Sequence, residues 1–134
     1  MRIRHQAFPL KHLIVCDASG SFDLSASKAL LRELAADPDF DANTEVLLDL
    51  RDIDCHMSTV DLYDLAAYMA WPDPALPTKK KIAILVTGRA GFDHAKFLEM
   101  CVRSRGIKLA AFDDYDDADE WLNADLPEDP KEAD

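Results

Sequence analysis

The chain has 134 residues, of which 49% are hydrophobic and 31% charged, and its formal net charge is −11. This length and apolar content predict one domain with a single packed core. No stretch reaches the roughly 18 consecutive apolar residues of a membrane span, and the first residues lack the apolar run of a secretory signal, so we expect a cytoplasmic protein without an integral membrane segment.

Short apolar runs rich in β-forming residues alternate with segments of helical period along the chain. Residues 2–8 are expected to form an edge strand, and residues 13–16 a buried strand that ends at the turn Asp17-Ala18-Ser19-Gly20. A helix is expected to begin near Asp23 and to stop at Asp37-Pro38. Its inward face would carry the apolar side chains Leu24, Leu31, Leu34 and Ala35.

The second half of the chain continues this alternation, with strands expected at residues 46–50, 82–86 and 107–112. The segment Ser58-Thr59-Val60-Asp61 has the pattern of a capping box that opens a helix. The inward faces of this helix and the two later ones are expected to be Leu62, Leu65, Ala66 and Met69, then Phe97, Leu98, Cys101 and Val102, then Ala118, Trp121 and Leu122. This order predicts an α/β fold with a mixed, mostly parallel sheet of four to five strands flanked by about four helices.

The negative charge is concentrated at the carboxyl end of the chain. Residues 113–134 contain eleven acidic side chains and one basic side chain, Lys131, whereas the rest of the chain is nearly neutral. Because such a segment repels phosphate backbones, we do not expect nucleic-acid binding. Residues 125–134 offer almost nothing to bury, so a disordered acidic tail is expected after a domain that spans residues 1–124. The basic run Lys79-Lys80-Lys81 is expected to be a solvated entry to a strand.

Cysteine and histidine spacing gives no indication of a metal or cofactor site. The chain has three widely spaced cysteines, Cys16, Cys55 and Cys101, and this odd number favours reduced thiols over a set of disulfides. No pair of them has the C-x-x-C spacing of a zinc site. Cys55 and His56 are adjacent, and adjacent side chains in extended chain point apart, so they do not form a nucleophile with its base. We therefore expect no metal, no cofactor and no catalytic residue.

Two further motifs lie where parallel strands are expected to end, which is where open α/β sheets place their sites. Asp49, Asp52 and Asp54 are hard oxygen ligands, and Asp49 at a strand end also suggests a receiver domain with a phosphoaspartate. A receiver needs a fifth pair of strand and helix, and a lysine at the end of its last strand, and the sequence lacks both. The glycine-bearing segment Thr87-Gly88-Arg89-Ala90-Gly91 is interpreted as a connecting turn.

Residues 46–59 resemble the STAS domain of anti-anti-sigma factors, in which a strand ending in Asp-Leu leads through a loop to a serine that opens a helix. The sequence is more similar still to the SpoIIAA-like branch, also described as STAS/Sec14-like. The motifs that carry this resemblance are Asp37-Pro38-Asp39-Phe40, Asp49-Leu50-Arg51-Asp52 and Ala118-x-x-Trp121-Leu122. The resemblance extends from about Lys11 to Leu122, and it implies a STAS-like fold.

The resemblance also implies a non-enzymatic regulatory module that is switched by phosphorylation. Ser58 falls where the family's phosphorylated serine lies, with Thr59 beside it, and the partner would be a kinase or an anti-sigma-like protein. In the family that serine follows an aspartate and soon precedes a glycine, whereas here Met57 and Val60 occupy these positions. The alternative from the residues alone is that Ser58 is an N-cap, with no switching role.

Sec14-like relatives imply a second function, the binding of a lipid or a small apolar molecule. The candidate wall of such a site consists of apolar and aromatic side chains around the second and third helices: Ile53, Met57, Tyr63, Met69, Trp71 and Phe92. The same side chains are equally compatible with plain core, because a sequence does not reveal a void. A homodimer also stays open as a partner arrangement.

Overall fold

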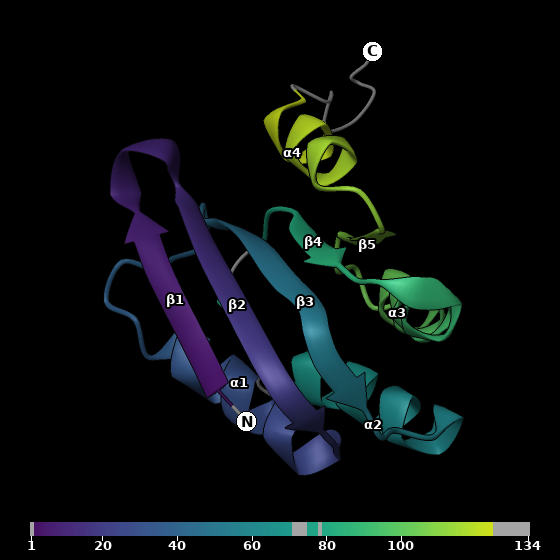
Figure 1. Ribbon diagram of the computed structural model, residues 1–134. Coiled ribbons are helices and arrows are strands. Elements are labelled where there is room, and N and C mark those ends of the chain that lie inside the picture. Colours follow the sequence, from purple (N-terminus) through teal and green to yellow (C-terminus); the bar gives the residue numbers. More distant parts are fainter. Residues whose placement is uncertain (1, 71–74, 78, 125–134) are drawn as a thin grey trace.

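The computed structural model describes residues 2–70, 75–77 and 79–124 (Figure 1). Its sheet has the order β1-β2-β3-β4-β5, in which β1 pairs antiparallel with β2 and all other pairs are parallel. The strands are β1 (Arg2–Phe8), β2 (Leu13–Phe22), β3 (Glu45–Cys55), β4 (Ile82–Leu85) and β5 (Leu109–Phe112). The helices are the short η1 (Pro9–Lys11), α1 (Leu24–Ala35), α2 (Thr59–Ala70), α3 (Gly88–Arg103) and α4 (Tyr115–Asn123).

The helices form two unequal layers around this sheet (Figure 1). The larger core lies between one sheet face and α1, α2 and α3, and the smaller one lies between the other face and α4. Successive side chains of β3 point to opposite faces of the sheet, so this strand contributes to both cores. Val46 and Leu48 belong to the larger core, and Leu47 between them belongs to the smaller one. The predicted mixed sheet flanked by helices is therefore confirmed. No helix in the described part of the chain has the length and apolarity needed to cross a bilayer.

The expected turn at residues 17–20 is wrong, because these residues lie inside β2. This strand pairs in parallel with β3 as far as Phe22 and Cys55, with one irregularity between Asp17 and Ser19. The turn-forming residues are thus held extended by hydrogen bonds to a neighbouring strand, which local propensity does not report. For the same reason, residues 51–55, which we expected in a loop, form the last part of β3.

Residues 88–91 also differ from the expected connecting turn. They form the first turn of α3, and Thr87 occupies the N-cap position with extended backbone. Gly88 has φ of +79°, a conformation that glycine adopts without strain. The glycines therefore permit a direct passage from β4 into α3, with hardly any loop between them.

The basic run is not fully solvated, because Lys81 is only 9% exposed. Its ammonium group donates hydrogen bonds to the carbonyl oxygens of Trp121 and Ala124, both at 2.7 Å, and lies 5.4 Å from the centre of the Trp121 ring. These carbonyls belong to the carboxyl end of α4, where a cation is favoured by the helix dipole. Lys81 thus fastens α4 to the start of β4.

Glu99, in the second half of α3, is the other buried charged side chain among the described residues, at 8% exposure. Its carboxylate accepts a hydrogen bond from the backbone N–H of Ala111 at 3.0 Å and forms ion pairs with Lys96 and Arg103. Strand β5 is at the edge of the sheet, so this N–H has no neighbouring strand to bond. Glu99 supplies the missing acceptor and joins α3 to the sheet edge.

We predict that Glu99→Leu lowers the free energy of unfolding by about 1–3 kcal/mol, because the buried N–H of Ala111 loses its acceptor. Glu99→Gln should lower the free energy of unfolding clearly less, since its amide oxygen still accepts this bond and the lost ion pairs involve Lys96, which is half exposed, and Arg103, which is mostly exposed. Urea unfolding of the two variants measures the difference. Equal losses would show that the hydrogen bond to β5 contributes nothing.

Candidate functional site

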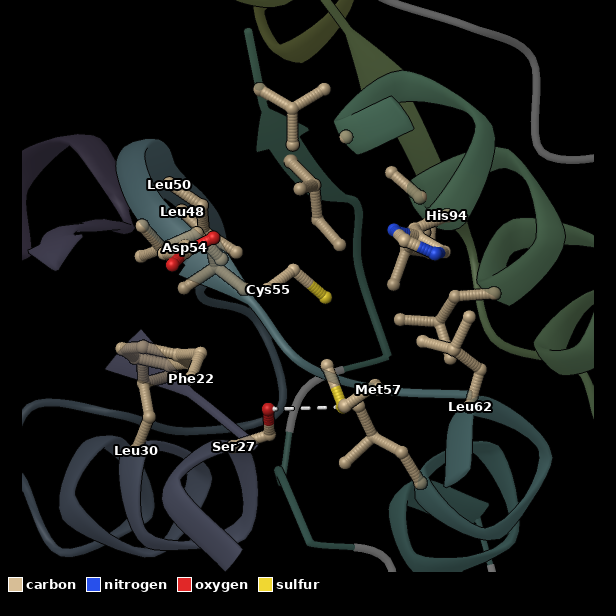
Figure 2. Close-up of a pocket in the computed structure, with 18 of the residues that line it drawn as sticks. Phe22, Ser27, Leu30, Leu48, Leu50, Asp54, Cys55, Met57, Leu62 and His94 are labelled. Atoms are coloured by element: carbon tan, nitrogen blue, oxygen red, sulfur yellow. Dashed lines mark hydrogen bonds between the residues drawn. The ribbon is translucent and has the colours of Figure 1, made fainter. Parts of the chain in front are cut away.

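A cavity of about 240 Å³ lies between the sheet and the layer of α1, α2 and α3 (Figure 2). Strands β3 and β4 form its floor, and each of the three helices contributes side chains to its wall. Most of these side chains are apolar. Those from α1 and α2 are Leu30, Leu31, Leu62, Leu65 and Met69.

Two features of the sequence leave this space open. First, α3 presents the small residues Ala90, Gly91 and Ala95 to the cavity, where larger side chains would close it. Second, the pairing of β3 with β4 ends at Asp49 and Leu85, whereas β3 continues beside β2 to Cys55. The last part of β3 therefore has no strand on its β4 side.

The mouth of the cavity lies at this end of the sheet. Asp54, Thr87 and Ala90 line the cavity and are also exposed to solvent. They come from the end of β3 and the start of α3, so the opening is at the carboxyl ends of two parallel strands. Ligand sites in open α/β sheets occur at this edge.

Few polar side chains reach the cavity, and their hydrogen bonding is unequal. Ser27 is buried, and its hydroxyl donates a hydrogen bond to the sulfur of Met57 at 3.5 Å (Figure 2). The imidazole of His94 and the thiol of Cys55 point into the cavity from α3 and β3 (Figure 2). His94 Nδ1 is buried without a hydrogen-bond partner. Burial raises the pKa of the Cys55 thiol, and the nearby Asp54 carboxylate raises it further.

Two of the acidic residues along β3, Asp49 and Asp54, each form a separate ion pair. The carboxylate of Asp49 accepts hydrogen bonds from Arg51 Nε at 3.0 Å and Nη2 at 2.9 Å, which hold its pKa below the usual range. Asp54 lies 3.0 Å from His56 Nε2. Within the described ranges, no three metal-ligating side chains come together. The strand order also differs from the 2-1-3-4-5 order of a receiver domain.

The apolar residues proposed from the sequence occupy different places. Ile53, Met57 and Met69 line the cavity. Tyr63 is 55% exposed, and its ring lies 5.6 Å from the guanidinium of Arg105. Phe92 packs against the larger core but does not line the cavity. Trp71 falls outside the described residues, as do residues 125–134 of the expected tail.

Ser58 lies at the surface, immediately before the first residue of α2, Thr59, which is also exposed. Its hydroxyl accepts a hydrogen bond from the N–H of Asp61 at 3.1 Å, and the Asp61 carboxylate accepts one from the N–H of Ser58 at 3.1 Å. These two bonds confirm the predicted capping box. Ser58 also follows Met57 directly, so the start of α2 and the cavity wall are contiguous in the chain.

Sequence reasoning missed the polar and small residues of the site. His94 and Ser27 belong to no recognisable motif, and the helical periodicity around them identifies only apolar residues. One usable signal was present, because Gly91 and Ala95 are four residues apart and therefore share one face of α3. Small side chains repeated on an inward helix face indicate either close packing or a void.

Comparison with known proteins finds similarity to solved structures. No family model matches the chain, and no curated protein matches it. Among solved structures, the chain is similar to the crystal structure of an uncharacterized protein from the DUF3478 family, with a SpoIIAA-like fold, from Shewanella loihica PV-4. The sequences are 17% identical, the match covers 90% of this chain and 92% of that one, and the TM-score is 0.54. The chain therefore has the SpoIIAA-like fold that its sequence resemblance predicted.

Proposed function

We propose that this domain binds a small, mainly apolar ligand in the cavity beneath α1, α2 and α3, and that its role is binding and not catalysis. The supporting observation is the cavity itself, because protein interiors are normally packed with few voids larger than a water molecule. An apolar protein cavity of about 150 Å³ holds benzene. In proportion, about 240 Å³ accommodates a ligand of roughly ten non-hydrogen atoms.

The size of the cavity limits the size of the ligand that the Sec14-like resemblance led us to expect. A diacyl phospholipid has several times more atoms than this space admits, so the proposed ligand is a small molecule or a short acyl segment. Entry occurs at the mouth between Asp54 and the start of α3, where wall residues are already exposed. Burial of apolar ligand surface against leucine and methionine side chains provides the driving force.

Filling the cavity tests this proposal. Ala95 is buried on the cavity wall, so Ala95→Leu places additional carbon atoms into the empty space. We expect this variant to unfold at higher temperature than the parent and to bind propylbenzene, used as a small apolar probe, at least tenfold more weakly. Thermal unfolding and isothermal titration calorimetry measure the two effects.

A matched control is Ala67→Leu, which adds the same atoms to a partly buried residue of α2 that does not line the cavity. This variant should bind propylbenzene as the parent protein does. Unchanged binding by Ala95→Leu, or no binding by the parent protein, would contradict the proposed function.

Alkylation of Cys55 provides an independent measure of occupancy. Because burial raises the pKa of this thiol, less of it is thiolate at neutral pH than in an ordinary cysteine, and thiolate is the reactive form. We expect iodoacetamide to modify Cys55 more slowly than a model peptide at pH 8, with a rate that keeps rising above pH 9. Saturating propylbenzene should slow the reaction further, and peptide mass spectrometry with a Cys55→Ser variant assigns the modified site. A rate unaffected by the probe would place the ligand elsewhere.

Ser58 supports a second candidate function, regulation of a protein partner by phosphorylation. The specific observation in its favour is an exposed hydroxyl at the start of a helix. A phosphate there adds a charge of about −1.5 to −2. The helix dipole favours this charge. However, the phosphate would also lie close to the Asp61 carboxylate, which caps the same turn. The repulsion would break the capping box and change the surface around it.

We predict that Ser58→Ala lowers the free energy of unfolding by about 1 kcal/mol, because the N-cap is lost. Ser58→Asn and Ser58→Asp should lower it by only a few tenths of a kcal/mol, because both residues cap helices well.

The Asn variant carries no charge and is the matched control for the phosphomimetic variant Ser58→Asp. A partner that the parent protein and Ser58→Asn capture in pull-downs should be lost with Ser58→Asp. Identical capture by all three proteins would count against phosphorylation as a switch.

A further inference from the structure

The two edges of the sheet differ in how their backbone groups are satisfied. Strand β5 has only four residues, and Glu99 bonds the N–H of Ala111 at this edge. Strand β1 has seven residues, and each of them pairs with β2 without a bulge. Among the described residues, β2 is the only strand that pairs with β1, which forms the outer edge of the sheet (Figure 1). Such an edge presents N–H and C=O groups to a strand of another chain.

Strand β1 has few of the features by which proteins prevent pairing at a sheet edge. Proline, bulges, short strands and charged side chains all serve this purpose. The strand itself contains no proline, and Pro9 comes only after it. Its exposed charged side chains are Arg2 and Arg4, which lie on the same face because they are two residues apart. Their effect on pairing therefore depends on the residues that they would stand opposite.

The sequence of β1 permits a symmetric antiparallel pairing with a second copy of the chain. In a dimer with a two-fold axis perpendicular to the sheet, opposite residues lie on the same face, so the axis passes through a residue. Only an axis at His5 uses all seven residues of the strand. The opposite residues are then Arg2 with Phe8, Ile3 with Ala7, Arg4 with Gln6, and His5 with itself.

Neither arginine stands opposite another arginine in this register. Arg4 is opposite the uncharged Gln6, and Arg2 is opposite Phe8, whose aromatic ring attracts a guanidinium. An axis at Arg4 would place two Arg4 side chains directly opposite each other, and like charges in this position are destabilising. An axis at Gln6 would leave Arg2 unpaired. Charge and strand length therefore favour the same register.

We propose that two copies of this chain associate through β1, in an antiparallel register centred on His5, so that their two sheets become one continuous sheet. The helices α1, α2 and α3 of both copies would then lie on the same side of the joined sheet. Since the axis reverses the strand direction, the two cavity mouths would lie at opposite ends of it. This inference does not depend on what the cavity binds.

Substitutions at Gln6 test the register, because residue 6 of each copy would lie opposite Arg4 of the other. Gln6 is exposed, so its replacement should not disturb the fold. We expect Gln6→Arg to weaken dimerisation and Gln6→Glu to strengthen it, each by about three- to tenfold, because the dimer contains this pair twice. Arg4 binds its own Asp17 through Nε and Nη2, and its guanidinium has further N–H groups for a glutamate. Sedimentation velocity at a series of protein concentrations measures the dissociation constants.

The signs of these effects distinguish the register from a general effect of charge. The chain has a net charge of −11, so Gln6→Arg lowers the overall repulsion between two copies and Gln6→Glu raises it. The proposed register predicts the opposite order of affinities. Ser104→Arg and Ser104→Glu make the same changes in net charge at an exposed position at the end of α3, and they serve as matched controls. They should alter the dissociation constant less than about twofold.

Amide hydrogen exchange on the parent protein locates the contact without any substitution. Every second N–H of an edge strand is directed away from its neighbour, and in the dimer these groups of β1 would be hydrogen-bonded. We expect them to exchange at least about tenfold more slowly well above the dissociation constant than well below it. A parent protein that stays monomeric at millimolar concentration would overturn the proposal. Dissociation constants that follow net charge, or concentration-dependent protection outside β1 alone, would overturn it as well.

Discussion

The position of the cavity depends on the unequal lengths of two parallel strand pairings, that of β3 with β2 and that of β3 with β4. Strand β3 pairs with β2 as far as Cys55, but its pairing with β4 ends at Asp49. Beyond that point β3 has a neighbour on one side only, and α3 begins almost directly after β4. A gap is left between the end of β3 and the first turns of α3. The mouth of the cavity occupies this gap, and Cys55 and His94 face the space behind it from its two sides (Figure 2).

Much of the architecture follows from local sequence patterns. The apolar spacing of Leu62, Leu65 and Met69 defines the buried face of α2, and Ser58 with Asp61 defines its start. These features depend on neighbours within one or two turns, so periodicity and capping rules describe them. The reach of β2 through Asp17 and Gly20 was not predictable in this way. It depends on hydrogen bonds to β3, whose pairing partners lie more than thirty residues away in sequence.

The cavity was less accessible to sequence reasoning than the fold. Ile53, Met57 and Met69 could be proposed because apolar side chains on α2 and just before it are obvious candidates for a wall. Tyr63 follows Leu62 by one position, so about 100° of helix rotation directs it to solvent. His94 carried no signal, because its interest comes from an unsatisfied nitrogen and from small neighbours on the same helix. Such a void arises from packing between elements, and its one local sign, the small residues Gly91 and Ala95 on one face of α3, indicates close packing equally well.

The two proposed activities share one segment of backbone. Met57 contributes to the cavity wall and accepts the hydrogen bond of Ser27, and the next residue, Ser58, caps α2. A ligand that packed against Met57 and Leu62 would favour the conformation in which Ser58 caps α2. A phosphate on Ser58 would displace this cap and bring its charge near the Asp61 carboxylate, which would oppose that conformation. If both activities operate, phosphorylation of Ser58 would weaken ligand binding, and a bound ligand would disfavour the phosphorylated form by the same factor at equilibrium. The cavity and the surface serine would then be coupled through the conformation of the chain at the start of α2.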